Sequence, residues 1–333
     1  MRGLIPRAVR RRVAGQIGLY RGARIRRRMA ALAAGGRPIL AGPWLGEVGF
    51  EILYWAPFVR WAASEFGIAP GRLWILSRGG TRSWYGTAAG RYYDVFDYLS
   101  PEEFRAWHEH RVSETGEQKQ TRMTDRERQL VTRVLGTTAA DAEILHPGVM
   151  YALMNPYWWR HLDEQWVRRH TLYSRLERPP RVEGLALPDR YIAAKFYFND
   201  CFPATDQNRD FVRTMMERMA QEAPVVSLSA GHALDDHGPC AVSAHGVLDV
   251  ADAAPARNLH VQSAIVANAT AFVGTYGGFA YLAPFYGVPS TSYYGDAGGF
   301  ARSHLQMARA AFAAIGLPDL LQVRSTSDVS PWS

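Results

Sequence analysis

Residues 271–292 read Ala-Phe-Val-Gly-Thr-Tyr-Gly-Gly-Phe-Ala-Tyr-Leu-Ala-Pro-Phe-Tyr-Gly-Val-Pro-Ser-Thr-Ser, and this stretch decides the fold of the chain. The pattern predicts a short buried strand over Ala271–Thr275, a sharp turn at Gly277 and Gly278, and a helix over Phe279–Tyr286. A glycine and a proline then end the helix before the next strand. A strand, a helix and a second strand in this order form a βαβ unit, which is typical of a parallel sheet.

The glycine turn is a candidate anion site. The free N–H groups and the dipole at a helix N-terminus both favour negative charge. We therefore expect a phosphate-bearing ligand at Thr275, Tyr276, Gly277 and Gly278, with the tyrosine able to stack on a base or a sugar. The alternative is an ordinary βαβ connection that binds nothing.

The same pattern recurs on both sides of a proline-rich linker at 178–188. Apolar runs at 38–41 and 72–77 flank a helical pattern over 52–66, and a second series of strands and helices begins at 191. We expect an α/β protein with two Rossmann-like, doubly wound parallel-sheet domains whose strand ends face a cleft, where ligands bind in such sheets. The predicted organisation is a basic arm over 1–37, a first domain over 38–180, a second domain over 188–320 and a C-terminal tail over 321–333.

The arm carries most of the basic charge. Residues 1–37 contain eleven arginines and no acidic residue, while the rest of the chain is slightly acidic. Val9, Val13, Ile17 and Tyr20 fall at helical spacing, which favours an interfacial helix on anionic lipid. A nucleic-acid-binding arm, an arginine-rich transit peptide and a tail without a partner are the alternatives.

Composition also predicts the compartment. The chain has two cysteines, no apolar run long enough to span a membrane and no apolar segment of a secretory signal after the arginines. These features favour the cytoplasm, with the inner face of the plasma membrane as the place where the arm would bind.

Several common motifs are absent. The chain contains no Gly-x-Gly pair, no P-loop and no Gly-x-Ser-x-Gly, which argues against dinucleotide-binding enzymes, P-loop NTPases and α/β-hydrolases. It also contains no Asp-x-Asp pair, so we expect no metal site and no cofactor.

The first β–α loop supplies a candidate catalytic group. Gly46 and Gly49 flank Glu47 directly after the first predicted strand, at the mouth of the expected cleft. Glu47 could take the proton of an acceptor hydroxyl as a general base. The alternative is a carboxylate that only complements a helix dipole.

The strand that opens the second domain supplies candidate donor contacts. Lys195 and Asn199 fall on the same face of this strand, and Arg209 follows at the start of the next helix. A lysine in an apolar strand is unfavourable unless it meets an anion, which a diphosphate or an internal carboxylate would supply.

A further loop and a helix complete the set of candidate residues. Asp235, Asp236 and His237 lie in a loop after a predicted strand, where they could hold a ribose or sugar hydroxyl, although an exposed turn explains them equally. Gln262 lies on the helix before the glycine turn and could bind a base or a phosphate.

Two segments resemble a known family. Residues 268–290 are similar to the strand, glycine turn and helix that grip the nucleotide diphosphate in the donor domain of GT-B glycosyltransferases, and Gly42–Glu51 looks like the matching acceptor-domain loop. The whole chain resembles uncharacterised proteins of bacterial surface-polysaccharide assembly. It departs from the family at Tyr286 and Gly287, where many retaining members place a glutamate, so inverting and retaining chemistry both stay open.

The resemblance implies a glycosyltransferase that moves a sugar from a nucleotide-sugar donor to a glycan or lipid-linked acceptor without a metal. No nucleic-acid partner is expected. A pyruvyl or other group transferase acting on glycans, and a non-catalytic glycan-binding protein of the same fold, are the alternatives.

Overall fold

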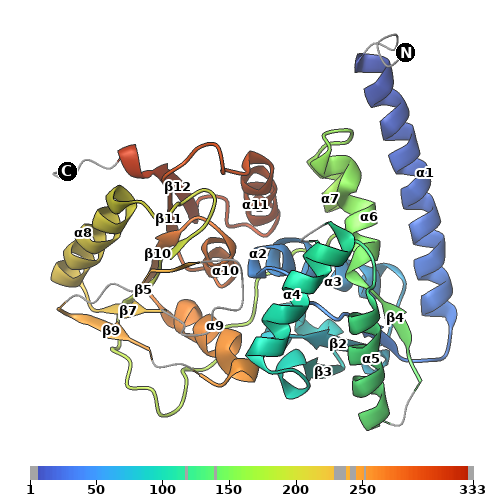
Figure 1. Cartoon of the computed structure of the whole chain (residues 1–333), viewed down its shortest axis with the longest axis horizontal. Coiled ribbons are helices and arrows are strands. Elements are labelled where there is room, and N and C mark those ends of the chain that lie inside the picture. The colour runs from blue at the N-terminus through green and yellow to red at the C-terminus, as the bar shows by residue number, and fades with distance from the viewer. Residues whose placement is uncertain are drawn as a thin grey trace.

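Two parallel β-sheets organise the chain, each wrapped by helices (Figure 1). The computed structural model describes residues 7–116, 119–138, 141–228, 238–240, 245–250 and 253–328. The sheets confirm the predicted pair of doubly wound α/β domains.

The first sheet has the order β3-β2-β1-β4, with all neighbours parallel. Leu40 in the central strand pairs with Trp74 on one side and Ile144 on the other. Because both faces of the central strands are covered, these strands are apolar throughout. The strands are β1 (Ile39–Ala41), β2 (Leu73–Ser77), β3 (Arg91–Asp94) and β4 (Glu143–Leu145).

The second sheet has the order β12-β11-β10-β5-β7-β9, again parallel throughout. The chain therefore winds outward from β5 in one direction and from β10 in the other, which is the Rossmann strand order. The topological switch point lies between β5 and β10, where ligands bind in such sheets. The strands are β5 (Ile192–Lys195), β7 (Val225–Ser227), β9 (Val247–Asp249), β10 (Ala271–Thr275), β11 (Ser290–Tyr294) and β12 (Leu321–Ser325), and a separate antiparallel pair joins β6 (Tyr197–Phe198) to β8 (Gly238–Pro239).

Edge strands are the elements that the sequence pattern misses. The predicted C-terminal tail contains β12, so the tail prediction is corrected for 321–325. The sequence Leu-Gln-Val-Arg-Ser alternates because only one face of this edge strand packs on the protein. The edge strand β4 completes the first sheet with only three residues, too few for a visible sequence pattern.

The helices follow the predicted pattern closely. Capping boxes form at Ser100 and Glu103 and at Thr124 and Glu127, two sites where the sequence has the matching Ser/Thr-x-x-Glu pattern. The α-helices are α1 (Arg7–Ala34), α2 (Val48–Phe50), α3 (Ala56–Glu65), α4 (Pro101–Thr115), α5 (Asp125–Thr138), α6 (Pro147–Trp158), α7 (Glu164–Arg168), α8 (Asp206–Glu222), α9 (Asn258–Asn268), α10 (Gly278–Phe285) and α11 (Arg302–Ala314).

A π-helical turn, η1 (Glu51–Trp55), connects α2 to α3. Pro57 has no N–H to donate to the carbonyl of Leu53, so the regular ladder is interrupted there. The hydroxyl of Tyr173 donates to that carbonyl instead, at 2.9 Å. The turn is therefore fixed by a hydrogen bond within the first domain.

One apolar core joins the two domains. The largest cluster of buried apolar side chains includes Trp44 and Trp55 of the first domain and Phe285 and Phe312 of the second. The two domains are therefore in contact through this cluster.

Candidate functional site

A pocket of about 250 Å³ lies between the two domains. It opens at the switch point of the second sheet, beside the segments that follow β5 and β10, and the first domain closes it with α2 and η1. The first domain lines the pocket with Glu47, Gly49, Phe50, Leu53 and Tyr54, and the second domain lines it with Asn199, Asp200, Cys201, Tyr276, Gly277, Gly278, Tyr281, Gly299, Ala301 and His304.

The two predicted glycine segments meet at this pocket. A Cβ atom added to Gly278 would lie 2.6 Å from the backbone nitrogen of Gly49 and 3.0 Å from Cβ of Val48. A Cβ added to Gly277 would overlap the hydroxyl of Tyr197. The first turn of α10 therefore packs directly on the first-domain loop, and only glycine leaves room for this approach.

Glu47 precedes α2 and lines the pocket. Its Oε1 accepts a 2.6 Å hydrogen bond from Nζ of Lys119, and the two side chains are 44% and 33% exposed. The same ammonium lies 3.7 Å from the ring centre of Phe50. The carboxylate of Glu47 is therefore oriented by a cation at the pocket rim and still reaches solvent.

A histidine and a tyrosine form the opposite part of the wall. Nδ1 of His304, in the first turn of α11, lies 2.7 Å from the hydroxyl of Tyr54. Burial, and then the charge of Lys119, lower the pKa of His304 to about 4. The imidazole is therefore neutral near pH 7 and can exchange hydrogen bonds with an uncharged ligand.

The tyrosines predicted near the turn are packed rather than free. Tyr281 donates to the hydroxyl of Tyr276 at 2.6 Å, and the Tyr276 ring lies 4.8 Å from that of Phe300. Cys201 beside them is no nucleophile, because burial raises the pKa of its thiol to about 11. Asn199 uses Oδ1 to accept from the backbone nitrogens of Cys201 and Phe202, so it shapes the turn that borders the pocket.

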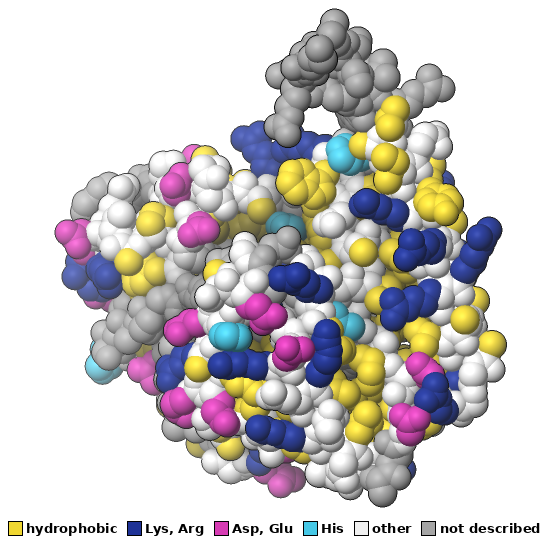
Figure 2. Space-filling view, turned by 45° about the vertical axis from the view of Figure 1, so that its right-hand side comes forward, with side chains coloured by type: hydrophobic (Ala, Val, Ile, Leu, Met, Phe, Trp, Pro, Cys, Tyr) yellow, Lys and Arg dark blue, Asp and Glu magenta, His cyan; other side chains and the backbone are white. Residues whose placement is uncertain are grey.

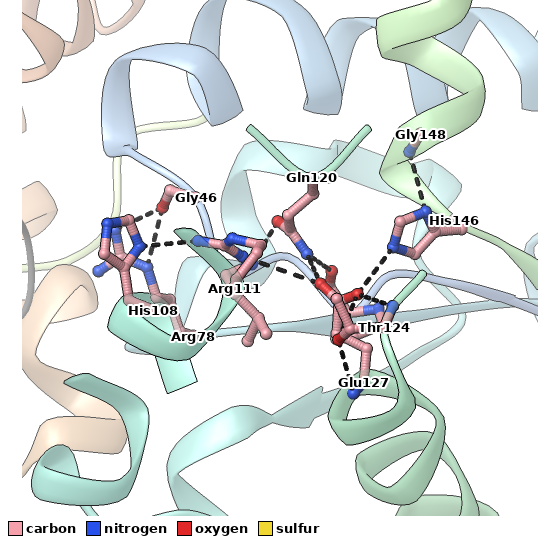
Figure 3. Close-up of polar contacts among 11 residues, drawn as sticks. Gly46, Arg78, His108, Arg111, Gln120, Thr124, Glu127, His146 and Gly148 are labelled. Carbon is pink, nitrogen blue, oxygen red and sulfur yellow. Dashed lines mark hydrogen bonds and ion pairs between the residues drawn. The ribbon is translucent and has the colours of Figure 1, made fainter. Parts of the chain in front are cut away.

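Buried charged and polar side chains hold the first-domain loop, which connects β1 to α2, in place (Figure 3). Arg78 donates to the carbonyl of Gly46 at 2.7 Å. Gln120 donates to the carbonyl of Pro43 at 2.9 Å and accepts from the backbone nitrogen of Leu45 at 2.8 Å. The loop between β1 and α2 is therefore held by hydrogen bonds at Pro43, Leu45 and Gly46. Gly46 itself does not line the pocket, although its carbonyl is one of these points.

Glu127 is the acidic centre of this network. It accepts from Gln120 at 2.7 Å and lies 3.8 Å from Arg111 and 3.5 Å from His146. Burial opposes ionisation, but hydrogen bonding and the charge of His146, together with the bonds from Thr124 and Gln120, hold the pKa of Glu127 below its ordinary value. The carboxylate is thus ionised inside the domain.

Lys195 lies outside the pocket wall. Its Nζ donates to Oε1 of Gln262 at 2.6 Å and to the carbonyl of Leu228 at 3.2 Å, and it lies 4.3 Å from the ring centre of Phe279. Gln262 is buried. These two predicted donor contacts therefore form a cluster of their own between β5 and α9.

The remaining predicted residues are placed as follows. Thr275 is buried, and its hydroxyl exchanges hydrogen bonds with the backbone N–H and carbonyl of Tyr197. Arg209 lies on α8 with its guanidinium 4.7 Å from the ring of Phe198. Asp235, Asp236 and His237 lie outside the described residues.

Three groups at the site were not predicted from the sequence: Tyr54 and His304 line the pocket, and Lys119 binds Glu47. Tyr54 closely follows the Gly46–Gly49 loop in the chain, whereas Lys119 and His304 come from segments far from both predicted glycine segments. One signal was available, because Gly298 and Gly299 precede the helix that carries His304 and form another glycine turn.

Among the described residues, no cluster of three or more His, Cys, Asp or Glu side chains could ligate a metal ion. No helix within the described part of the chain combines the length and the apolar character needed to cross a bilayer.

No protein-family model and no curated protein matches this chain. Among solved structures, the chain is similar to E. coli ADP-heptose lipopolysaccharide heptosyltransferase II, with 11% identity over 89% of this chain and 95% of that one and a TM-score of 0.43. It is also similar to E. coli heptosyltransferase WaaC with ADP, with 10% identity over 89% and 96% of the two chains and a TM-score of 0.41. The glycosyltransferase SnogD from Streptomyces nogalater gives 15% identity over 86% and 85% and a TM-score of 0.39. These structures are glycosyltransferases, the class that the sequence resembles, but similarity this weak carries no information about the chemistry of this chain.

Proposed function

We propose that the protein is a glycosyltransferase that takes a sugar from a nucleotide-sugar donor. The observation that carries the proposal is the pocket at the switch point, where the Glu47 loop of one domain meets the Gly277-Gly278 turn of the other. A group held at the start of α10 would lie within the same pocket as a carboxylate of the opposite domain. This is the arrangement needed to transfer a group between two bound substrates.

Glu47 is the proposed base. In a single displacement its carboxylate takes the proton of an acceptor hydroxyl, and the acceptor oxygen bonds to the anomeric carbon. The bond from that carbon to the diphosphate oxygen breaks, and its electron pair leaves with the nucleoside diphosphate. The free N–H groups at the start of α10 would stabilise the charge that develops on this leaving group.

The donor is larger than the pocket. A volume of about 250 Å³ suits the transferred sugar and the adjoining phosphates rather than a whole nucleotide sugar. We assign the rest of the donor to the Lys195 and Gln262 cluster and to Arg209, Asp235, Asp236 and His237. The reaction needs no metal in this proposal, since the backbone N–H groups at the start of α10 stabilise the leaving diphosphate.

The acceptor is a glycan or a lipid-linked glycan of surface-polysaccharide assembly, and the protein acts in the cytoplasm or on the inner face of the plasma membrane. The exposed carboxylate of Glu47 and the neutral imidazole of His304 suit a hydroxyl-rich, uncharged acceptor. Mass analysis of the product distinguishes sugar transfer from transfer of a pyruvyl group, and proton NMR reports the anomeric configuration.

Titration calorimetry with UDP-, GDP-, CMP- and ADP-sugars tests the proposal. At least one donor should bind, and Gly278→Val and Lys195→Ala should weaken that binding. Glu47→Gln should keep donor binding and lower the transfer rate by about 10²- to 10⁴-fold, the usual contribution of a general base. Glu102→Gln, an exposed change on α4, is the matched control.

Absence of donor binding would contradict the proposal, as would a Glu47→Gln variant with the transfer rate of the wild type. Binding of a glycan with no turnover of any donor would favour the non-catalytic alternative.

A further inference from the structure

The outer face of α1 carries an apolar end and a basic end. Val13, Ile17 and Tyr20 are 52%, 48% and 72% exposed, and Arg24 and Arg27 are exposed farther along. These five residues follow one another at spacings of three and four, so they form a single stripe along the helix. Large side chains this exposed on one helix face indicate a contact surface.

The inner face of α1 is fixed to the first domain. A Cβ added to Gly18 would lie 2.8 Å from Pro156, and one added to Gly22 would lie 2.5 Å from Trp166. Met29 is completely buried. Because α1 is packed so closely on α6 and α7, its outer stripe cannot turn inward and stays available to a partner.

The loop after α6 exposes another large apolar side chain. Trp159 is 71% exposed, and Arg160 beside it is exposed as well. This loop lies against the N-terminal half of α1, because a Cβ on Gly15 would lie 3.6 Å from the carbonyl of His161. Figure 2, in which the α1 side of the molecule comes forward, shows basic side chains along its right-hand part with hydrophobic side chains nearby.

The C-terminal end of α6, directly before this loop, borders the wall of the pocket. The ring of Trp158 packs at 5.7 Å from Phe50 and 5.3 Å from Tyr54, which both line the pocket. The hydroxyl of Tyr157 donates to the carbonyl of Ser303, the residue before His304. The exposed indole of Trp159 therefore lies one residue from a side chain that packs on the pocket lining.

We propose that an anionic lipid bilayer binds the surface formed by Val13, Ile17, Tyr20, Arg24, Arg27 and Trp159, which we call the α1–Trp159 surface. Aromatic and aliphatic side chains enter the boundary between head groups and acyl chains, while arginines contact anionic head groups. Residues 1–46 contain no acidic residue, so nothing on α1 opposes a negative surface. A second copy of the chain would meet the same positive charge, and a nucleic acid would leave the apolar end uncovered.

This proposal deepens the proposed function, and it rests on that function where it concerns the acceptor. With the α1–Trp159 surface on the bilayer, the first domain faces the membrane, and Trp158 lies between Trp159 and the pocket lining. A lipid-linked acceptor could then enter beside Trp158 and Glu47 without leaving the bilayer.

Co-sedimentation of the full chain with vesicles tests the surface without any nucleotide sugar. We expect binding to phosphatidylcholine vesicles that contain phosphatidylglycerol and little binding to phosphatidylcholine alone. Arg24→Gln with Arg27→Gln should lower the partition coefficient roughly 25-fold, about fivefold for each arginine. Ile17→Glu with Tyr20→Glu, and Trp159→Ala, should each weaken binding without lowering thermal stability, because these side chains are exposed.

Matched controls lie on other helices. Arg128→Gln with Arg133→Gln removes two exposed arginines from α5, and Val112→Glu changes an exposed apolar residue on α4. Both controls should keep vesicle binding. Equal binding to neutral vesicles, equal losses in the controls, or a dimer that Ile17→Glu with Tyr20→Glu dissociates would overturn the proposal. Because the assay contains no donor, a failure here is distinct from a failure of sugar transfer.

Discussion

The two glycine segments that meet at the pocket are held in place in different ways. The first-domain loop depends on buried charged and polar side chains, among them Arg78, Gln120 and Glu127. The Gly277-Gly278 turn depends on close packing, with no space for a Cβ atom at either residue. Charge therefore positions one half of the pocket and shape positions the other.

This difference predicts which changes each half tolerates. A buried network fails when one charge is removed, because its partner stays buried without compensation. A close backbone contact is disrupted when a larger side chain is introduced, because the packed neighbouring atoms can move only slightly.

The largest effect is expected from Glu127→Gln. The substitution removes the negative charge that lies 3.8 Å from the buried guanidinium of Arg111. Loss of one member of a buried ion pair lowers the free energy of unfolding by about 3–5 kcal/mol. Urea denaturation measures this loss, and Glu102→Gln, on the exposed surface of α4, should change stability by less than about 1 kcal/mol. Equal effects of the two substitutions would mean that the network does not support the domain.

Because the pKa of Glu127 is lowered, its carboxylate stabilises the folded protein at neutral pH, and this stabilisation is lost in acid. The stability of the wild type should fall as the pH drops below the ordinary range of a glutamate and the folded carboxylate takes up a proton. Glu127→Gln should lack this part of the acid transition.

Glu51, in the π-helical turn behind the loop, should give the opposite pH dependence. Burial raises its pKa to about 7, although Ser77, Arg78, Tyr85 and Thr81 favour the charged form. Stability contributed by the protonated form is complete below the ordinary pKa of a glutamate and is lost as the pH rises through 7. The loss amounts to about 3 kcal/mol.

Glu51→Gln should remove this decline. Urea denaturation at pH 5 and pH 8 on both proteins gives the comparison, and the difference between the two pH values should be smaller in the variant. An unchanged difference would show that the carboxyl is ionised throughout this range.

Gly278→Ala tests the half that depends on shape. The added Cβ would lie 2.6 Å from the Gly49 nitrogen, so the two domains must shift apart. Overpacking of this kind lowers the free energy of unfolding by about 1–3 kcal/mol. Gly136→Ala on α5, where a Cβ meets open space, should leave stability unchanged or raise it by up to about 1 kcal/mol. A loss at Gly136 as large as that at Gly278 would contradict the steric explanation.

The fold was predictable where strands are buried on both faces. The runs at 38–41, 72–77 and 271–275 are apolar because helices cover both sides of the sheet, and a buried run is visible in the sequence. The strands β3, β4, β9 and β12 lie at sheet edges and are short, so none of them forms a continuous apolar run in the sequence.

The pocket was predictable where it depends on backbone conformation. Glycine turns and the ends of parallel strands are visible in the sequence, and Glu47, Asn199 and Gly278 do line one pocket. His304 and Lys119 were not predictable in this way, because nothing local in the sequence indicates that they reach Tyr54 and Glu47.

The smallest change in stability is expected from Lys119→Met, which removes the exposed partner of Glu47. Both side chains reach solvent, and such pairs contribute about 0–1 kcal/mol, so denaturation should hardly change. The electrostatic effect on the pocket should be larger, because the charge of Lys119 contributes to the low pKa of His304 while Glu47 opposes it. Removing the cation should therefore raise that pKa toward its ordinary value, which NMR titration of the His304 ring measures. Arg128→Gln, a distant loss of one positive charge, should leave the His304 titration unchanged. A shift of equal size in both variants would mean that the net charge of the protein, rather than Lys119 at the pocket rim, keeps the imidazole neutral.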